Sequence, residues 1–307
     1  MTLNFVYRGT GGPRDVQLPP APPWRQFPLQ SHGPVFQAPA GLVEAVNAAL
    51  WLRRPLLITG PPGSGKSTAI ESVATELKLG AVLRWHITSR SNLPDALYRY
   101  DVLGRIHAQQ INPEQSTDDI APFLRLGPLG TALAPRDRPR ALLIDEIDKS
   151  DLDLPSDLLD VLERGTFEIA ELVRHAEPEV QIREWDGEGS QRIVSGRVQC
   201  TEFPFIVMTS NGERDFPGPF LRRCIRFEMP RPNKAMLRQI IGAHLAQTSE
   251  SEEQSLLIAE FTRRLESGEE LAVDQLLNAA HILSDDKLTG EQRAGLKELL
   301  MRRLSSG

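Results

Sequence analysis

Cysteine is scarce in this chain. Cys200 and Cys224 are the only two among 307 residues, and they lack the spacing of metal ligands. Such sparse cysteine usage fits a reducing cytosol better than a secreted setting. The chain also lacks an apolar run long enough to span a membrane, and its first eight residues lack the apolar stretch of a secretory signal. We therefore expect a cytoplasmic protein without a membrane span.

Excess positive charge is also missing. The chain has 35 Lys and Arg against 41 Asp and Glu, for a formal net charge of −6. This balance argues against a generally basic nucleic-acid surface, although a local basic channel would not show in the sum. His86 and His107 have no partner histidines or cysteines at ligand spacing, so we do not read them as metal ligands. A hydrophobic content of 40% and a charged content of 25% are typical of a soluble globular protein.

One stretch has a specific chemical meaning, and it follows a short apolar run at Leu56–Thr59 that suits a buried strand. It satisfies G-x-x-x-x-G-K-[ST] in full and reads Gly60-Pro61-Pro62-Gly63-Ser64-Gly65-Lys66-Ser67-Thr68. Apolar residues at helical spacing follow it. A strand, a glycine loop and a helix start together cradle phosphates. We expect Lys66 to reach the β- and γ-phosphates and Ser67 to join a Mg²⁺ shell. A glycine turn that merely precedes a helix is the alternative.

A second apolar run, Ala141–Ile144, ends in the carboxylates Asp145 and Glu146. A buried parallel strand delivers such residues to the carboxyl edge of an α/β sheet, where ligands bind. We expect Asp145 to hold Mg²⁺ and Glu146 to orient the attacking water. An acidic pair can also be the solvated end of a strand, but the phosphate loop earlier in the chain favours the functional interpretation.

The rest of the sequence predicts three regions along the chain and the helices and strands within them. We expect a Pro-rich N-terminal arm over 1–34, which is either anchored through Trp24 and Phe27 or free, a nucleotide-binding core over 35–230 and a helical domain over 231–307. Residues 111–139 read as loosely structured. Helices are predicted at 42–50, 69–77, 93–109, 154–164, 237–245, 256–265, 271–283 and 296–304, strands at 81–88 and 205–210, and a hairpin at 180–194.

Four ordered motifs resemble those of the AAA+ ATPases, within them the MoxR and dynein-like group. They are Gly60–Thr68, Ile144–Lys149, Met208–Asn211 and Leu221–Cys224. The resemblance implies an α/β P-loop NTPase fold, with a parallel five-stranded sheet, flanking helices and a small C-terminal all-α lid. It implies that Asn211 is the sensor-1 residue; an Asn-Gly turn is compatible with that role.

The resemblance also implies an arginine finger that acts on the nucleotide of a neighbouring subunit. Arg223 is preferred over Arg222, because it aligns with the arginine of the group's Leu-Asp-Arg-Phe pattern. The alternative is a plain basic pair at a helix end. The chain departs from the family in its lid, where Asp274 stands at the expected sensor-2 arginine. Sensor 2 therefore stays unassigned.

The resulting expectation is an Mg²⁺-dependent ATPase that works as a homo-oligomeric ring, a hexamer in this group, and remodels or assembles a protein partner. Substrate contact would fall to two inserted regions, 93–139 and 180–194, and the resemblance allows a companion with a von Willebrand A domain. A slow ATP-dependent switch or scaffold in a regulatory or defence complex is the alternative. A nucleic-acid motor is disfavoured, because the inserts lack alternating basic and aromatic residues. Asn233-Lys234-Ala235-Met236 lacks the aspartate of a guanine-reading motif, which favours ATP.

Overall fold

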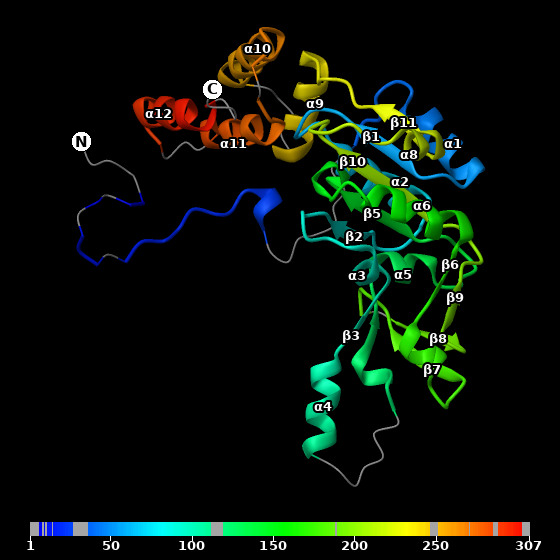
Figure 1. Cartoon of the computed structure of the whole chain (residues 1–307). Helices are drawn as coiled ribbons and strands as arrows, with labels where there is room; N and C mark the ends of the chain where they lie inside the picture. Colours follow the sequence, from blue (N-terminus) through cyan, green and yellow to red (C-terminus); the bar gives the residue numbers. More distant parts are fainter. Residues whose placement is uncertain are drawn as a thin grey trace. The chain divides into compact units, whose positions relative to one another are not determined.

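The computed structural model describes residues 6–7, 9, 11–13, 15–26, 36–111, 119–187, 189–245, 251–269, 271–284 and 288–302 (Figure 1). These residues belong to two compact units. The larger unit contains Ala38–Gly60 and Lys66–Met229. The other contains the described residues up to Gln37, Pro61–Gly65 and the chain from Pro230 onward. The region boundaries expected from the sequence stay predictions.

The larger unit is built on a parallel sheet of five strands, which confirms the expected fold class. Each strand is a short, mostly apolar run, as in sheets covered on both faces. The register aligns Leu56 with both Val207 and Ile225, so the three strands they belong to begin at the same edge. The strand order is β11 (Ile225–Glu228), β1 (Leu56–Thr59), β10 (Phe205–Ser210), β5 (Ala141–Asp145) and β2 (Leu83–His86).

Helices cover this sheet, and three of them lie close to their predicted positions. Helix α1 (Leu42–Leu52) packs on β11 and β1, and α2 (Lys66–Glu76) packs on β5 and β10. Helix α6 (Leu154–Arg164) has the predicted bounds and ends at Gly165 in the left-handed conformation, a common helix stop. Helix α8 (Gly218–Arg223) packs against α6 and β11.

A second sheet of six strands belongs to the same unit. The predicted hairpin forms its middle, where Glu179 pairs with Val194 and Arg183 pairs with Ser190. The other four strands are too short to show a periodic pattern, and the sequence did not predict them. The order is β3 (Tyr98–Tyr100), β4 (Leu124–Leu126), β7 (Glu179–Arg183), β8 (Ser190–Val194), β9 (Arg197–Gln199) and β6 (Thr166–Glu168), with α7 (Ala170–Val173) after β6.

The single helix predicted over 93–109 is wrong. The chain forms α3 (Leu93–Leu97), then strand β3, then α4 (Val102–Ile111). Tyrosines favour strands, and Tyr98–Tyr100 pairs antiparallel with β4. Tertiary pairing therefore overrides the helical pattern at this point.

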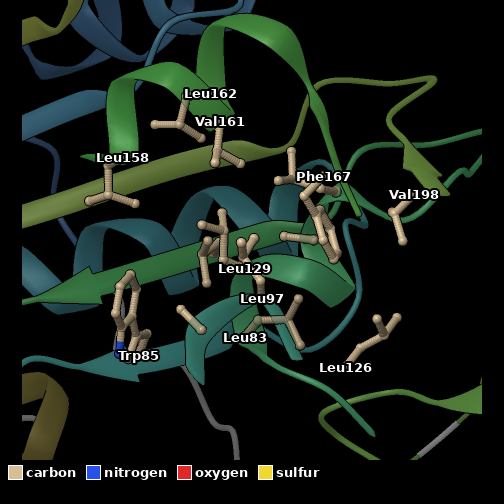
Figure 2. Packing of buried hydrophobic residues seen from close by; sticks show 14 of the residues in the cluster. Leu83, Trp85, Leu97, Leu126, Leu129, Leu158, Val161, Leu162, Phe167 and Val198 are labelled. Atoms are coloured by element: carbon tan, nitrogen blue, oxygen red, sulfur yellow. The ribbon is translucent and has the colours of Figure 1, made fainter. Parts of the chain in front are cut away.

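The expectation of loose structure over 111–139 is wrong for its described part; residues 112–118 lie outside the described residues. Helix α5 (Pro128–Leu133) is buried at every position and contacts strands of both sheets. Its glycine permits close packing rather than marking a loop, because a Cβ on Gly130 would lie 1.9 Å from the carbonyl oxygen of Leu97. Figure 2 shows the resulting core, in which Leu129 lies near Leu97, Leu83 and Phe167.

The described residues of the second unit form four α-helices with their own apolar core, which confirms the expected C-terminal all-α part. Trp24, in the single turn Pro23–Arg25, packs against this core and donates from Nε1 to Oδ1 of Asn278 at 3.3 Å. Phe27, the other expected anchor, lies outside the described residues. The helices are α9 (Lys234–Leu245), α10 (Glu252–Glu266), α11 (Val273–Leu283) and α12 (Gly290–Leu300). None of the helices in the described ranges is long and apolar enough to cross a membrane.

Candidate active site

The glycine loop between β1 and α2 adopts backbone conformations that require its glycines. Gly60, Gly63 and Gly65 have φ angles of +146°, +70° and +86°. A Cβ on Gly60 would also lie 2.9 Å from the Cβ of Met229, so a larger residue is excluded by space as well as by conformation. Ser64 in this loop is 7% exposed, and its Oγ has no hydrogen-bond partner among the described residues. The loop therefore offers a buried polar atom that an external ligand can satisfy.

Lys66 opens helix α2 and joins two of the predicted motifs. It is 7% exposed, and its Nζ donates to the carbonyl oxygen of Gly60 at 2.8 Å and to Oδ1 of Asn211 at 2.9 Å. Burial lowers the pKa of Lys66, while the charges of Asp148, Asp145 and Glu146 act in the opposite direction. The lysine and the predicted sensor-1 residue are thus direct neighbours.

Ser67 and Asp145 are also in direct contact. The Ser67 hydroxyl donates to Oδ1 of Asp145 at 3.0 Å, and the Thr209 hydroxyl donates to the same oxygen at 2.5 Å. Thr209 also accepts a hydrogen bond from the backbone N–H of Glu146 at 2.9 Å. Thr209 is 1% exposed and was given no role from the sequence. Its hydroxyl holds both residues of the acidic pair in place. The sequence did not indicate this role, because Thr209 lies within a mostly apolar strand.

Glu146 sits in a left-handed conformation, with φ 60° and ψ 49°. This conformation is uncommon outside glycine and is typical of sites where the surrounding structure fixes a side chain. The Glu146 carboxylate accepts a hydrogen bond from Lys149 at 2.7 Å, and Nε2 of His86 lies 3.7 Å away. The hydrogen bond that Lys149 donates to Glu146 raises the pKa of Lys149. Lys149 therefore holds the carboxylate of Glu146, the residue predicted to orient the attacking water.

Asp148 is a second residue that the sequence left without a role. It is 5% exposed, and its Oδ2 accepts from the backbone N–H groups of Asn211 at 2.9 Å and of Glu213 at 3.2 Å. Its Oδ1 has no hydrogen-bond partner among the described residues. Asp148 therefore ties the segment after β5 to the segment after β10, and it fixes the backbone of Asn211. The sequence signal that could have indicated this role is a third carboxylate, Asp148, soon after Asp145 and Glu146.

Arg222 and Arg223 do not belong to this cluster. They end α8, immediately before β11, whose first residue is in register with the first residue of β1. They therefore lie at the edge where the strands begin, opposite the edge that carries Asp145. Arg223 forms an ion pair with Glu163 of α6, in which both side chains are about half exposed. The residue Arg222 is exposed, and its carbonyl accepts from Arg54 at 3.2 Å.

Asp274, which stands at the position of the expected sensor-2 arginine, lies in the first turn of α11. Its side chain is exposed. In the same unit a Cβ on Gly63 would lie 2.8 Å from the backbone nitrogen of Val273. The loop glycine thus has a packing reason in addition to its positive φ.

The comparison with protein families agrees with this site. The family model described as an AAA domain of the dynein-related subfamily matches residues 55–221. A search of curated proteins finds no match. Among solved structures, NtrX from Brucella abortus in complex with ADP aligns with a TM-score of 0.44 and 14% identity. That alignment covers 84% of this chain and 55% of the NtrX chain, so this chain spans little more than half the length of that protein.

Proposed function

This chain belongs to the dynein-related subfamily of AAA domains, and from that premise we propose that it is an Mg²⁺-dependent ATPase that assembles into a ring and remodels a protein partner. The observation that carries the proposal is the contact of motif residues from three separate segments. Lys66 bonds to Asn211, and Ser67 bonds to Asp145. Such a set is the one needed to hold and hydrolyse a nucleoside triphosphate.

The donor set fits a nucleotide with Mg²⁺. Among the described residues no group of three carboxylate, histidine or cysteine side chains is placed to hold a metal. One carboxylate and one hydroxyl, from Asp145 and Ser67, are the sparse oxygen ligands expected when Mg²⁺ also binds phosphates and water. When bound, the ion supplies charge neutralisation at the phosphates. The Lys66 amine fits an anionic ligand, and the buried Ser64 hydroxyl has no hydrogen-bond partner among the described residues.

The residues have distinct roles in this proposal. Lys66 neutralises phosphate charge, and Asn211 holds the lysine from the side of β10. Glu146 accepts a proton from, or orients, the attacking water once Lys149 releases its carboxylate. Arg223 acts in trans on the site of a neighbouring subunit after leaving Glu163, and Arg222 is the alternative finger. The position of both arginines at the opposite edge of the sheet supports a role towards a neighbour rather than within the same subunit.

A slow nucleotide switch is the second candidate. Two of the proposed catalytic side chains, Glu146 and Arg223, are engaged in ion pairs, which favours a resting state that needs a trigger. Asp274 in place of the usual lid arginine favours weak coupling between the lid and the phosphates. Ring size, a companion with a von Willebrand A domain and a cytoplasmic location belong to the proposal as predictions.

The test is steady-state ATP hydrolysis as a function of protein concentration. We expect specific activity to rise with concentration, because a finger in trans links turnover to assembly. Glu146→Gln and Arg223→Ala are expected to lose turnover and keep nucleotide affinity, while Arg192→Gln, which changes one exposed charge elsewhere, serves as the control. Tight binding with few turnovers would favour the switch. If activity is independent of concentration and Arg223→Ala has normal turnover, Arg223 is not an arginine finger that acts in trans. Arg222→Ala then tests whether Arg222 has that role.

A further inference from the structure

Three arginines stand side by side on the exposed face of the second sheet. Arg99 of β3 is directly opposite Arg125 of β4, and Arg125 is in register with Arg183 of β7. All three residues are exposed. Neighbouring strands lie about 5 Å apart, and like charges directly opposite each other destabilise a sheet. The fold alone therefore gains nothing from this arrangement, which we call the arginine row.

No carboxylate neutralises the arginine row among the described residues. Arg125 donates from Nε to the carbonyl oxygen of Glu184 at 3.3 Å and from Nη2 to the carbonyl oxygen of Trp185. Arg183 donates to the carbonyl oxygen of Pro122 at 3.1 Å. Carbonyl groups orient a guanidinium but leave its full charge, so the positive potential of the row extends into solvent.

Trp185 adds rigidity to two members of the row. The guanidinium carbons of Arg99 and Arg125 lie 5.3 Å and 5.0 Å from the centroid of its ring. Such cation–π contacts hold the guanidinium groups against the indole. A planar fork that is already oriented loses less entropy when it binds a carboxylate or phosphate in bidentate fashion.

The extent of the positive charge decides which anion fits. On the same face Arg192 is paired with Glu179, and Arg197 donates to the uncharged side chains of Thr166 and Gln199. The run of adjacent arginines is confined to three strands, because Ser190 of β8 is the residue opposite Arg183. Nucleic-acid binders commonly contact about six to ten phosphates, and this chain carries a net charge of −6. A short carboxylate-rich stretch of protein matches three guanidinium groups better than a nucleic-acid backbone does.

We propose that the arginine row of Arg99, Arg125 and Arg183 is a docking site for an acidic segment of a partner protein. The inference rests on the proposed function only in taking the partner to be a protein, since the binding itself needs neither ATP nor assembly. It predicts that the partner segment is negatively charged and that it contacts the arginine row. The row combines strands from both inserted regions, residues 93–139 and 180–194.

The test is equilibrium binding of a fluorescein-labelled glutamate-rich peptide to the full chain, measured by fluorescence anisotropy at low salt without nucleotide. The double variant Arg99→Gln/Arg183→Gln is compared with the native protein, and Arg125 is kept because it bonds two carbonyls of the sheet. We expect about tenfold weaker binding in the double variant, since exposed charge pairs contribute modestly. Arg192→Gln is the matched control, from the same face, and is expected to change affinity less than about twofold.

Three binding outcomes overturn the proposal. A native protein that fails to bind the peptide, or an Arg192→Gln variant that weakens binding as much as the double variant does, removes the docking site. Tighter binding of a single-stranded oligonucleotide with the same number of charges, lost in the same double variant, replaces the acidic protein with nucleic acid. Circular dichroism melts establish that the variants fold. Turnover is measured in parallel: peptide binding without ATP hydrolysis would refute the proposed function and leave the arginine row standing.

Discussion

Replacing Thr209 by valine tests the inference that one hydroxyl organises the acidic pair. Valine keeps the shape and the strand preference of threonine, so the change removes two hydrogen bonds with little repacking. The hydroxyl donates to Asp145 at 2.5 Å and accepts from the N–H of Glu146 at 2.9 Å. A hydrogen bond to a charged group contributes about 1.5–3 kcal/mol and a neutral one about 1 kcal/mol. We expect the free energy of unfolding to fall by about 3 kcal/mol.

The assay is urea denaturation followed by circular dichroism, with Thr209→Ser as the matched variant that keeps the hydroxyl. Serine is expected to retain most of the stability, because only a methyl group is lost. ATP turnover is measured in the same preparations and is expected to fall in the valine variant more than in the serine variant, since Glu146 loses its backbone anchor. A valine variant within about 0.5 kcal/mol of the serine variant would refute the reasoning, because the two hydrogen bonds would then contribute almost nothing.

Three further predictions follow from the same structure. Asp148→Ala removes the acceptor of the Asn211 and Glu213 N–H groups, so we expect a loss of about 2–4 kcal/mol in denaturant titrations. Asp148→Asn should lose less, because its amide oxygen can still accept these hydrogen bonds, and equal losses in the two variants would contradict the acceptor role. Burial raises the pKa of Cys224 to about 12 from 9.0, so its contribution to stability is complete below pH 9 and is lost as the pH rises towards 12. The free energy of unfolding of Cys224→Ala should therefore decline less than that of the native protein over this pH range. Parallel curves of unfolding free energy against pH for the two proteins would disprove the raised pKa. Glu163→Gln breaks a half-exposed ion pair with Arg223 and should lower the free energy of unfolding by less than about 1 kcal/mol. Arg223→Ala should lower ATP turnover about a thousandfold or more. A large loss of stability in Glu163→Gln would mean that the ion pair serves to stabilise the fold.

Local patterns in the sequence predicted the elements whose interactions are mainly local. The run Leu56–Thr59 is apolar because a central parallel strand is buried on both faces, and the following glycines are needed at positive φ. Helix α6 has the predicted bounds because its apolar stripe lies within eleven residues and its glycine stop, Gly165, follows directly. Asp145, Glu146 and Asn211 were predicted by their position at strand ends, and the sheet brings them to the same edge.

Tertiary structure alone decided the features that depend on pairing between distant segments. Tyr98–Tyr100 becomes a strand only because β4 offers it a partner, and Gly130 is a site of close approach only because Leu97 packs there. Thr209 and Asp148 acquire roles from atoms more than sixty residues away in the chain. The three members of the arginine row are likewise separated by 26 and 58 residues and meet only across strands. A sequence read in order records neighbours along the chain, whereas hydrogen bonding across a sheet creates neighbours that no local pattern encodes.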